Sequence, residues 1–117
     1  GLATVSYTFS GFPSKIRIGP FDFQVEFAES LSDGDVPLWG MYLPSVGKIR
    51  FQRVLPCRNM AVDVVLHEVG HGVLANAGCN ENLREEQVVS AFATGFTQVL
   101  IDNPKLVSWL TKTLRRR

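Results

Sequence analysis

The sequence has little of several features that decide between classes of protein. It contains two histidines and two cysteines in 117 residues, and its 12 Lys and Arg nearly balance its 11 Asp and Glu. This balance argues against a surface dedicated to nucleic acid or to a charged membrane, since both need an excess of one sign. No apolar run reaches the roughly eighteen residues of a membrane span, and no basic stretch followed by an apolar one opens the chain. We therefore expect no nucleic-acid partner, no membrane span and no signal peptide.

The scarcity of cysteine also restricts how the chain is stabilised. Cys57 and Cys79 are too few for a disulfide framework and do not form a C-x-x-C pair, so we expect reduced thiols and a cytoplasmic protein. A chain of this length buries roughly two thirds of its unfolded surface without disulfides. We therefore expect one domain over residues 1–117.

The first half of the chain carries short runs that are typical of strands. Apolar residues alternate with polar ones over residues 15–27, with a break at Gly19 and Pro20, which predicts a pair of strands. Residues 38–43 and 48–53 predict a hairpin, and residues 30–37 predict an exposed loop. We expect a small antiparallel sheet built from these hairpins over about residues 15–55.

The second half predicts helices. A first helix over about residues 59–77 is closed by Gly78, a second covers about 83–101, and a third begins near Pro104. Because the first helix is apolar nearly all round, we expect it to be buried at the centre of the fold. The face of the second helix that packs on the first is predicted to carry a stripe of five residues: Glu86, Val89, Ala93, Phe96 and Leu100. Strands followed by helices, here over about 58–114, indicate an α+β domain.

Both histidines fall in one motif inside the first predicted helix. Residues 67–71 read H-E-x-x-H, and residues four apart lie on the same helix face, so both imidazoles can reach one metal ion. Glu68 follows the first histidine and could hold a water at that ion. The alternative is that His67 and His71 are ordinary core residues. Against it, Glu68 shares a helix face with small and apolar residues, where an ionised carboxylate needs a polar partner.

Two glycines inside the same helix also call for an explanation. Gly70 and Gly72 each cost roughly 1 kcal/mol relative to Ala in a helix interior. We therefore expect another element or a substrate to approach the helix closely at these positions.

A catalytic zinc usually has three protein ligands, and this sequence has no third histidine. The candidates for the third ligand are Glu81, Glu85, Glu86, Asp63 and Cys79. Glu81 and Cys79 belong to the turn after the helix, too far along its axis. If Asn82 caps the second helix, Glu85 takes the third helical position, where a carboxylate commonly reaches back to the cap. Glu86 heads the stripe predicted to pack on the first helix. We therefore favour Glu86 as the third ligand, with Glu85 as the alternative.

With these residues in place, the chain resembles the zincin metallopeptidases of the glutamate-ligand branch. It is similar in particular to small metallopeptidase-like proteins encoded by phages and prophages, whose nearest broad relatives are ImmA/IrrE-type domains. The resemblance covers roughly residues 15–110 and includes the hairpin at 38–41, the motif at 67–71 and the segments 85–89 and 102–104. The chain departs from larger members in the short interval between the motif and Glu86.

The resemblance implies peptide-bond hydrolysis with one zinc ion per chain. Glu68 would act as general base and acid, and the substrate would pair with an edge strand of the predicted hairpin. Tyr42 or Tyr7 could donate a hydrogen bond to the oxyanion, although such tyrosines more often serve packing. Asp63 could accept a hydrogen bond from the ring of His67, or could simply stabilise the start of its helix.

Two other functions compete with this interpretation. A chain of 117 residues leaves little area for a substrate cleft, so the domain could be a zinc-stabilised binding protein or a virion-associated phage protein without turnover. A metal-free DNA-binding domain is the third hypothesis, and it predicts no bound zinc. For the peptidase we expect a peptide or protein substrate and the host cytoplasm as its location if a phage encodes it.

Overall fold

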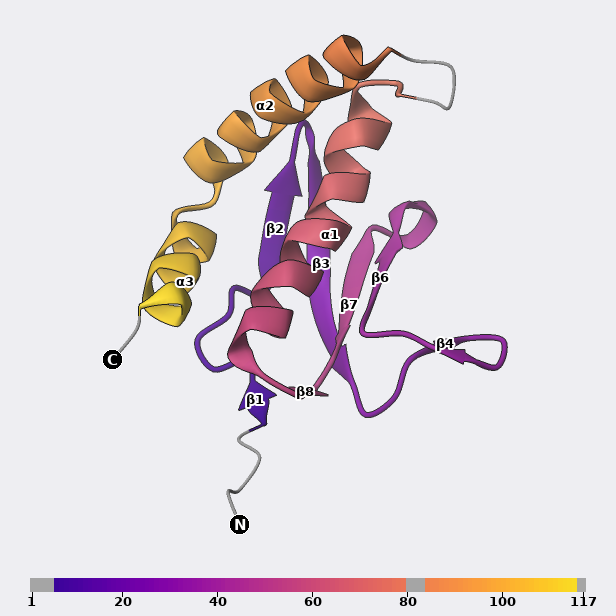
Figure 1. Cartoon of the computed structure of the whole chain (residues 1–117), viewed down its shortest axis with the longest axis vertical. Helices are drawn as coiled ribbons and strands as arrows, with labels where there is room; N and C mark the ends of the chain where they lie inside the picture. The colour runs from indigo at the N-terminus through magenta and orange to yellow at the C-terminus, as the bar shows by residue number, and fades with distance from the viewer. Residues whose placement is uncertain (1–5, 80–83, 116–117) are drawn as a thin grey trace.

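The structure is a computed structural model that describes residues 6–79 and 84–115. It confirms the α+β class, with strands in the first half of the chain and helices in the second (Figure 1). The main sheet has the order β2-β3-β7-β6, formed by β2 (Lys15–Ile18), β3 (Phe21–Ala28), β7 (Lys48–Gln52) and β6 (Gly40–Leu43). The helices are α1 (Arg58–Asn76), α2 (Glu85–Asp102) and α3 (Pro104–Leu114). In the part of the chain that the structure describes, none of these helices has the length and apolar character needed to cross a membrane.

The sheet is mixed rather than antiparallel. The predicted hairpins are confirmed, because β2 pairs antiparallel with β3, and β6 pairs antiparallel with β7 across a short 3-10 turn, Pro44–Val46. The central pair β3 and β7 is parallel, so the expectation of an antiparallel sheet is wrong there. The reason is that the chain returns along β6 before it enters β7, so β3 and β7 run in the same direction.

Two small strand pairs complete the strand-rich half. The segment predicted as an exposed loop forms a short hairpin of β4 (Ser32–Asp33) and β5 (Val36–Pro37), which projects from the body of the molecule (Figure 1). All of its residues are exposed, and the buried Leu31 anchors its base. Near the N-terminus, β1 (Tyr7–Thr8) pairs with β8 (Val54–Leu55).

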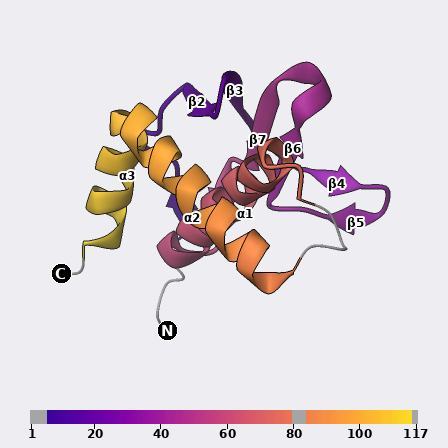
Figure 2. The ribbon, with the colours of Figure 1, turned by 90° about the horizontal axis from the view of Figure 1, so that it is seen from above.

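The helices build outward from the sheet in layers. Seen from above, α2 crosses α1 (Figure 2), and both helices contact β2 of the sheet. The alternating residues Ile16, Ile18 and Phe23 of the sheet turn to the core and are buried, as the strand pattern predicts. The core that they share with α1 and the other helices also contains Ile49, Phe51, Leu55, Val65, Val69, Val99, Leu106 and Trp109. The position of α1 is therefore set by burial against the sheet on one side and α2 on another.

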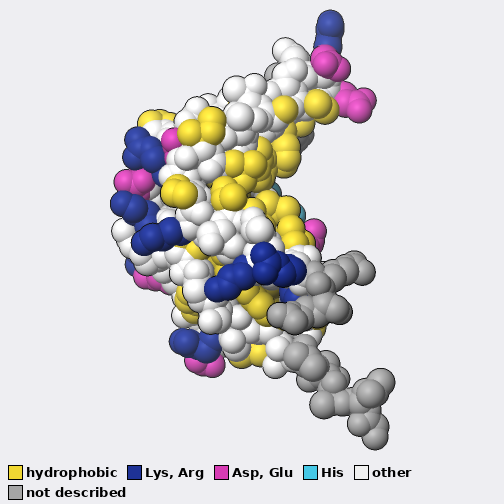
Figure 3. Space-filling model, turned by 90° about the vertical axis from the view of Figure 1, so that its left-hand side faces the viewer, with side chains coloured by type: hydrophobic (Ala, Val, Ile, Leu, Met, Phe, Trp, Pro, Cys, Tyr) yellow, Lys and Arg dark blue, Asp and Glu magenta, His cyan; other side chains and the backbone are white. Residues whose placement is uncertain are grey.

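The outer face of the sheet carries alternating charges. Asp22 lies within ion-pair distance of Lys15 and Arg17, and Glu26 is 3.0 Å from Lys48 and 2.9 Å from Arg50. In Figure 3, dark blue and magenta side chains gather along one edge, whereas hydrophobic side chains gather over the hollow beside α2. The sheet therefore presents its charged face to solvent and its apolar face to α1.

Two predictions about helix packing are wrong. First, α1 is not buried all round, because it has an exposed strip that contains Asp63, His67 and His71, and Leu66 beside it is 38% exposed. Second, the predicted stripe on α2 faces largely outward: Val89 is 53% exposed and Leu100 is 42% exposed. Instead α2 turns Gly95 to Val73 of α1, so closely that a Cβ on Gly95 would lie within 2.4 Å of that valine.

Candidate metal-binding and catalytic site

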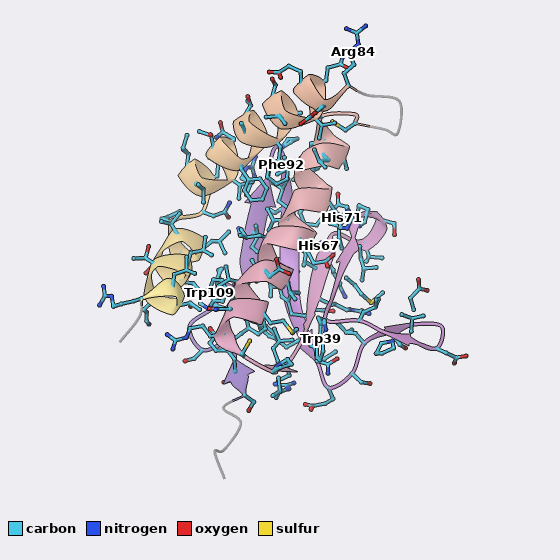
Figure 4. The ribbon with its side chains drawn as sticks, in the orientation of Figure 1. Trp39, His67, His71, Arg84, Phe92 and Trp109 are labelled. Carbon is cyan, nitrogen blue, oxygen red and sulfur yellow. The ribbon has the colours of Figure 1, made fainter. Side chains whose placement is uncertain are left out.

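The two histidines of the motif project from the uncovered strip of α1, on the side where β6 lies (Figure 4). Their Nε2 atoms are 3.2 Å apart, and the two rings are nearly perpendicular, at 82°. Two nitrogens that bind one tetrahedral zinc at about 2.05 Å each lie roughly 3.3 Å from one another. The separation of His67 and His71 is compatible with two ligands on one ion and equally with a hydrogen bond between the two ring nitrogens, and both rings are accessible from solvent.

Glu68 lies about 100° round the helix from His67 and is buried, with 7% of its surface exposed. Its side chain fills the space between α1 and the edge strand β6. A Cβ added to Gly40 of β6 would lie 2.9 Å from Cγ of Glu68, so only glycine lets the strand come this close. Burial raises the pKa of Glu68, while the two histidines and the backbone N–H of Tyr42 lower it. The Tyr42 amide is a polar partner of the kind that the sequence predicts for this carboxylate.

The backbone of β6 has free hydrogen-bonding groups beside this carboxylate. The N–H of Gln52 donates to the carbonyl of Trp39 at 2.9 Å, which fixes the alternation of the antiparallel pair. By that alternation Met41 turns its backbone groups to β7, whereas Gly40 and Tyr42 turn theirs to the outer edge, where the N–H of Tyr42 is already bound to Glu68. Among the described strands, β6 pairs with β7 alone. An extended peptide could therefore be added at this edge, next to Glu68.

The structure separates the two candidate tyrosines. The ring of Tyr42 stacks beside the ring of His71, with centroids 6.3 Å apart and planes at 16°. Burial raises the pKa of Tyr42, so it stays a neutral hydrogen-bond donor. Tyr7 instead accepts a hydrogen bond from the indole of Trp109 at 2.8 Å, within an aromatic cluster of the core. Tyr7 is therefore a packing residue away from the histidines, and Tyr42 is the candidate that lies at the site.

The glycines of α1 permit close approach, as predicted. A Cβ on Gly72 would lie 2.8 Å from Cδ1 of Ile18 in β2 and 3.3 Å from the ring of Tyr42. A Cβ on Gly70 would meet only the ring of Phe92 of α2, at 3.4 Å. The neighbouring elements that come close are therefore β2 and β6 at Gly72 and α2 at Gly70.

A third ligand is not in place beside the histidines. Within residues 6–79 and 84–115, no three His, Cys, Asp or Glu side chains are grouped so that they could hold a metal ion. Asp63 is exposed, and no hydrogen bond joins it to His67 among the described residues. Cys79 lines a pocket with His71 but forms no such group. Glu81 and Asn82 lie outside the described residues.

The start of α2 also differs from the prediction. Arg84 is the N-cap residue, and its backbone N–H donates to the side chain of Gln87 at 3.0 Å. Glu85 is therefore the first helical residue rather than the third, and it does not cap the helix from within. Successive residues turn by about 100° around a helix. Glu85 therefore lies on the side of α2 that carries Val88, toward α1, whereas Glu86 lies on the side away from α1. The orientation of α2 thus favours Glu85 over Glu86, and the third ligand itself stays a prediction.

An open pocket of about 420 Å³ adjoins His71. It is lined by Tyr42, His71, Leu74, Ala75, Cys79 and Val88. Neither this pocket nor the role of Gly40 is predicted from the sequence. A glycine inside a predicted strand was the available signal, since it often marks a close approach of another chain segment.

Comparison with known proteins adds no relative: no family model, no curated protein and no solved structure matches this chain.

Proposed function

We propose that this chain is a zinc-dependent metallopeptidase. The observation that carries the proposal is the 3.2 Å separation of the histidine Nε2 atoms, next to a buried carboxylate and a free strand edge. Both histidines are exposed to solvent, which argues against the alternative that they are ordinary core residues. The motif, the exposure of the rings and the burial of Glu68 together support a hydrolytic site.

The residues present fit two of the zinc ligands. His67 and His71 would hold the ion, and Glu85, or Glu86 as predicted from sequence, would complete the set after a shift of the first turn of α2. When bound, zinc supplies Lewis-acid chemistry, because it polarises a carbonyl and lowers the pKa of a water.

The remaining chemistry belongs to residues of the chain. Glu68 accepts the proton of the attacking water and passes it to the leaving amine. The edge of β6 orients an extended peptide through the backbone groups of Gly40 and the carbonyl of Tyr42, since the N–H of Tyr42 is bound to Glu68. The ring of Tyr42 stacks beside that of His71, and its hydroxyl would stabilise the oxyanion. The substrate is therefore a peptide or an extended segment of a protein.

Metal analysis and peptide cleavage test the proposal together. Protein prepared without chelator is expected to carry about one zinc per chain, as is Glu68→Gln, whereas His67→Ala and His71→Ala lose it. Glu68→Gln should lose peptide cleavage by a factor of at least about 100. Zinc-free wild-type protein would refute the proposal. Comparing Glu85→Gln with Glu86→Gln identifies the third ligand, because only the variant of the true ligand loses zinc.

A zinc-stabilised binding or virion-associated protein is the second candidate, favoured by the small size of the domain. It predicts full zinc content and no cleavage by wild type, so that Glu68→Gln changes nothing. A cytoplasmic location is part of the main proposal. It is supported by the free thiols of Cys57 and Cys79.

A further inference from the structure

A second pocket lies where the segment after β1 meets the end of β3. Its volume of about 300 Å³ is at the small end of the range of roughly 300 to 1,000 Å³ found for ligand pockets. It is lined by two aromatic, two hydroxyl-bearing and one basic residue, which are Phe9, Phe27, Thr8, Ser10 and Arg53. None of these residues lines the pocket beside His71, so the two pockets are separate.

The aromatic residues of this second pocket belong to a cluster of rings in the core. The ring centroid of Phe9 lies 5.3 Å from that of Phe51 and 5.9 Å from that of Trp109, and both pairs are stacked. The ring centroid of Phe27 lies 5.1 Å from that of Phe9. Phe51 and Trp109 are buried, whereas Phe9 and Phe27 are half-buried. The pocket is therefore the open side of the cluster, where one more ring can pack at the usual centroid spacing of about 4.5 to 7 Å.

Arg53 brings a positive charge to this pocket. Its backbone N–H donates to the carbonyl of Ala28 at 2.8 Å, which fixes the residue at the end of β3. Its Nε donates to the carboxylate of Glu29 at 2.6 Å. A guanidinium has five N–H donors, and within residues 6–79 and 84–115 no hydrogen bond joins the Nη atoms of Arg53 to the protein. These Nη donors are available to a ligand.

Glu29 competes only weakly for this arginine. The side chains of Arg53 and Glu29 are 54% and 82% exposed, and ion pairs exposed to this degree contribute little to stability. Arg53 can therefore exchange Glu29 for an anion in the pocket, or bind that anion through Nη while Nε stays on Glu29. In both cases the negative charge of Glu29 opposes the anion, so removing that charge should strengthen binding.

We propose that this pocket binds an aromatic carboxylate, with the ring against Phe9 and Phe27 and the carboxylate on the Nη atoms of Arg53. A planar carboxylate and a guanidinium pair through two parallel hydrogen bonds, which fixes the orientation of the ligand. The hydroxyls of Thr8 and Ser10 line the same pocket and can also donate to the carboxylate. The small volume suits a single ring, so the ligand is a free aromatic acid or the C-terminal aromatic residue of a peptide. The site does not depend on the proposed peptidase chemistry.

An NMR titration of the full chain with N-acetyl-phenylalanine tests the proposal. We expect a Kd of about 1 mM, as for other ligands of this size. The backbone N–H signals of Phe9, Ser10 and Arg53 should shift, and those of His67 and His71 should not. The amide of N-acetyl-phenylalanine lacks the charge and N-acetyl-alanine lacks the ring, so each should bind at least about fivefold more weakly.

The two partners of the ion pair should have opposite effects. Arg53→Gln should weaken binding by at least about fivefold, whereas Glu29→Gln should strengthen it about two- to fivefold. Loss of the ion pair alone would make the two variants behave alike, so opposite effects distinguish ligand binding from a structural role. Arg50→Gln is the matched control, because Arg50 pairs with Glu26 on the outer face of the sheet and does not line the pocket. It should bind like the wild type, and urea unfolding checks that all three variants are folded.

The same titrations contain the outcomes that would overturn the proposal. Equal affinity for the acid and its amide, or wild-type affinity in Arg53→Gln, would remove the role of the charge. Shifts at His67 and His71 in place of Phe9 and Arg53 would put the acid at the histidines instead. A comparison with N-acetyl-Gly-Gly-Phe assigns the source of the ligand: a similar Kd indicates a peptide C-terminus, and binding at least about tenfold weaker indicates a free acid.

Discussion

Replacing each of the two glycines inside α1 by alanine should change stability in different directions. Both substitutions gain about 1 kcal/mol of helix propensity, so any difference between them comes from their surroundings. The Cβ of Gly70→Ala meets the ring of Phe92 at 3.4 Å, an ordinary contact with a side chain that is 40% exposed and free to adjust. We expect Gly70→Ala to stabilise the fold by roughly 0.5 to 1 kcal/mol.

Gly72→Ala meets a different environment. Its Cβ would lie 2.8 Å from Cδ1 and 3.3 Å from Cγ2 of Ile18, which is 1% exposed, and 3.3 Å from the ring of Tyr42. Overpacking of this kind costs about 1 to 3 kcal/mol, which offsets the propensity gain or exceeds it. We therefore expect Gly72→Ala to be less stable than Gly70→Ala by about 1 to 3 kcal/mol.

Urea unfolding at unchanged m-value measures the difference, and the midpoint of thermal unfolding should differ by roughly 3 to 12 °C. A double-mutant cycle tests the cause. Ile18→Val removes the Cδ1 atom and alone costs about 0.5 to 1.5 kcal/mol, but it should cost less in the Gly72→Ala background because it relieves the clash. Equal stabilisation by both alanines, or no coupling with Ile18→Val, would refute the packing argument.

Three further predictions follow from other contacts. Gly40→Ala would push a Cβ against the side chain of Glu68, so cleavage should fall while zinc content stays at the wild-type level, as metal analysis and kinetics of the same preparation can show. Asn103→Ala removes hydrogen bonds of 2.8, 2.8 and 2.7 Å from a buried side chain to the main chain of β2 and α2. It should cost about 2 to 4 kcal/mol in urea unfolding, well above the cost of Asn76→Ala, which loses one such bond. Hydrogen bonds from two basic side chains of β7 hold the pKa of Glu26 below its ordinary value of 4.5. Its stabilising contribution is therefore full above that pH and is lost as the pH falls through the lowered pKa; an acid titration of stability should be shallower in Glu26→Gln, and an unchanged titration would contradict this.

Local patterns were enough to predict most of the elements. The alternation over residues 15–27 and the turn residues after it gave the two hairpins, and helical spacing gave α1 and its end at Gly78. These features depend on residues close together in the chain. The parallel pairing of β3 with β7 was missed because periodicity shows which face of a strand is buried and says nothing about its neighbour.

In the candidate site, too, the features set by local structure could be predicted, and those set by tertiary packing could not. His67 and His71 lie one helical turn apart, so their convergence follows from helix geometry and could be predicted. A third ligand depends on how α2 is rotated about its own axis, which is a matter of tertiary packing. The packing face predicted for α2, through Glu86 and Val89, does not include Gly95, the residue that lets α2 approach α1 most closely. Rotating α2 so that Gly95 faces α1 brings Glu85, rather than Glu86, round to the side of the site.

Two glycines let β6 and α2 pack closely against the two flanks of the exposed strip of α1. On one side Gly40 lets β6 close over Glu68, and on the other Gly95 lets α2 close over Val73. Neither glycine has a positive φ, so backbone conformation does not require them, and close approach does. Because β6 and α2 are each held against a flank of α1, the face between them keeps its histidines and the exposed Leu66 uncovered. The exposure of Leu66 does not by itself mark this face as functional, since Ile101 is 68% exposed and Val89 is 53% exposed elsewhere; what distinguishes the face is the pair of exposed histidines one helical turn apart.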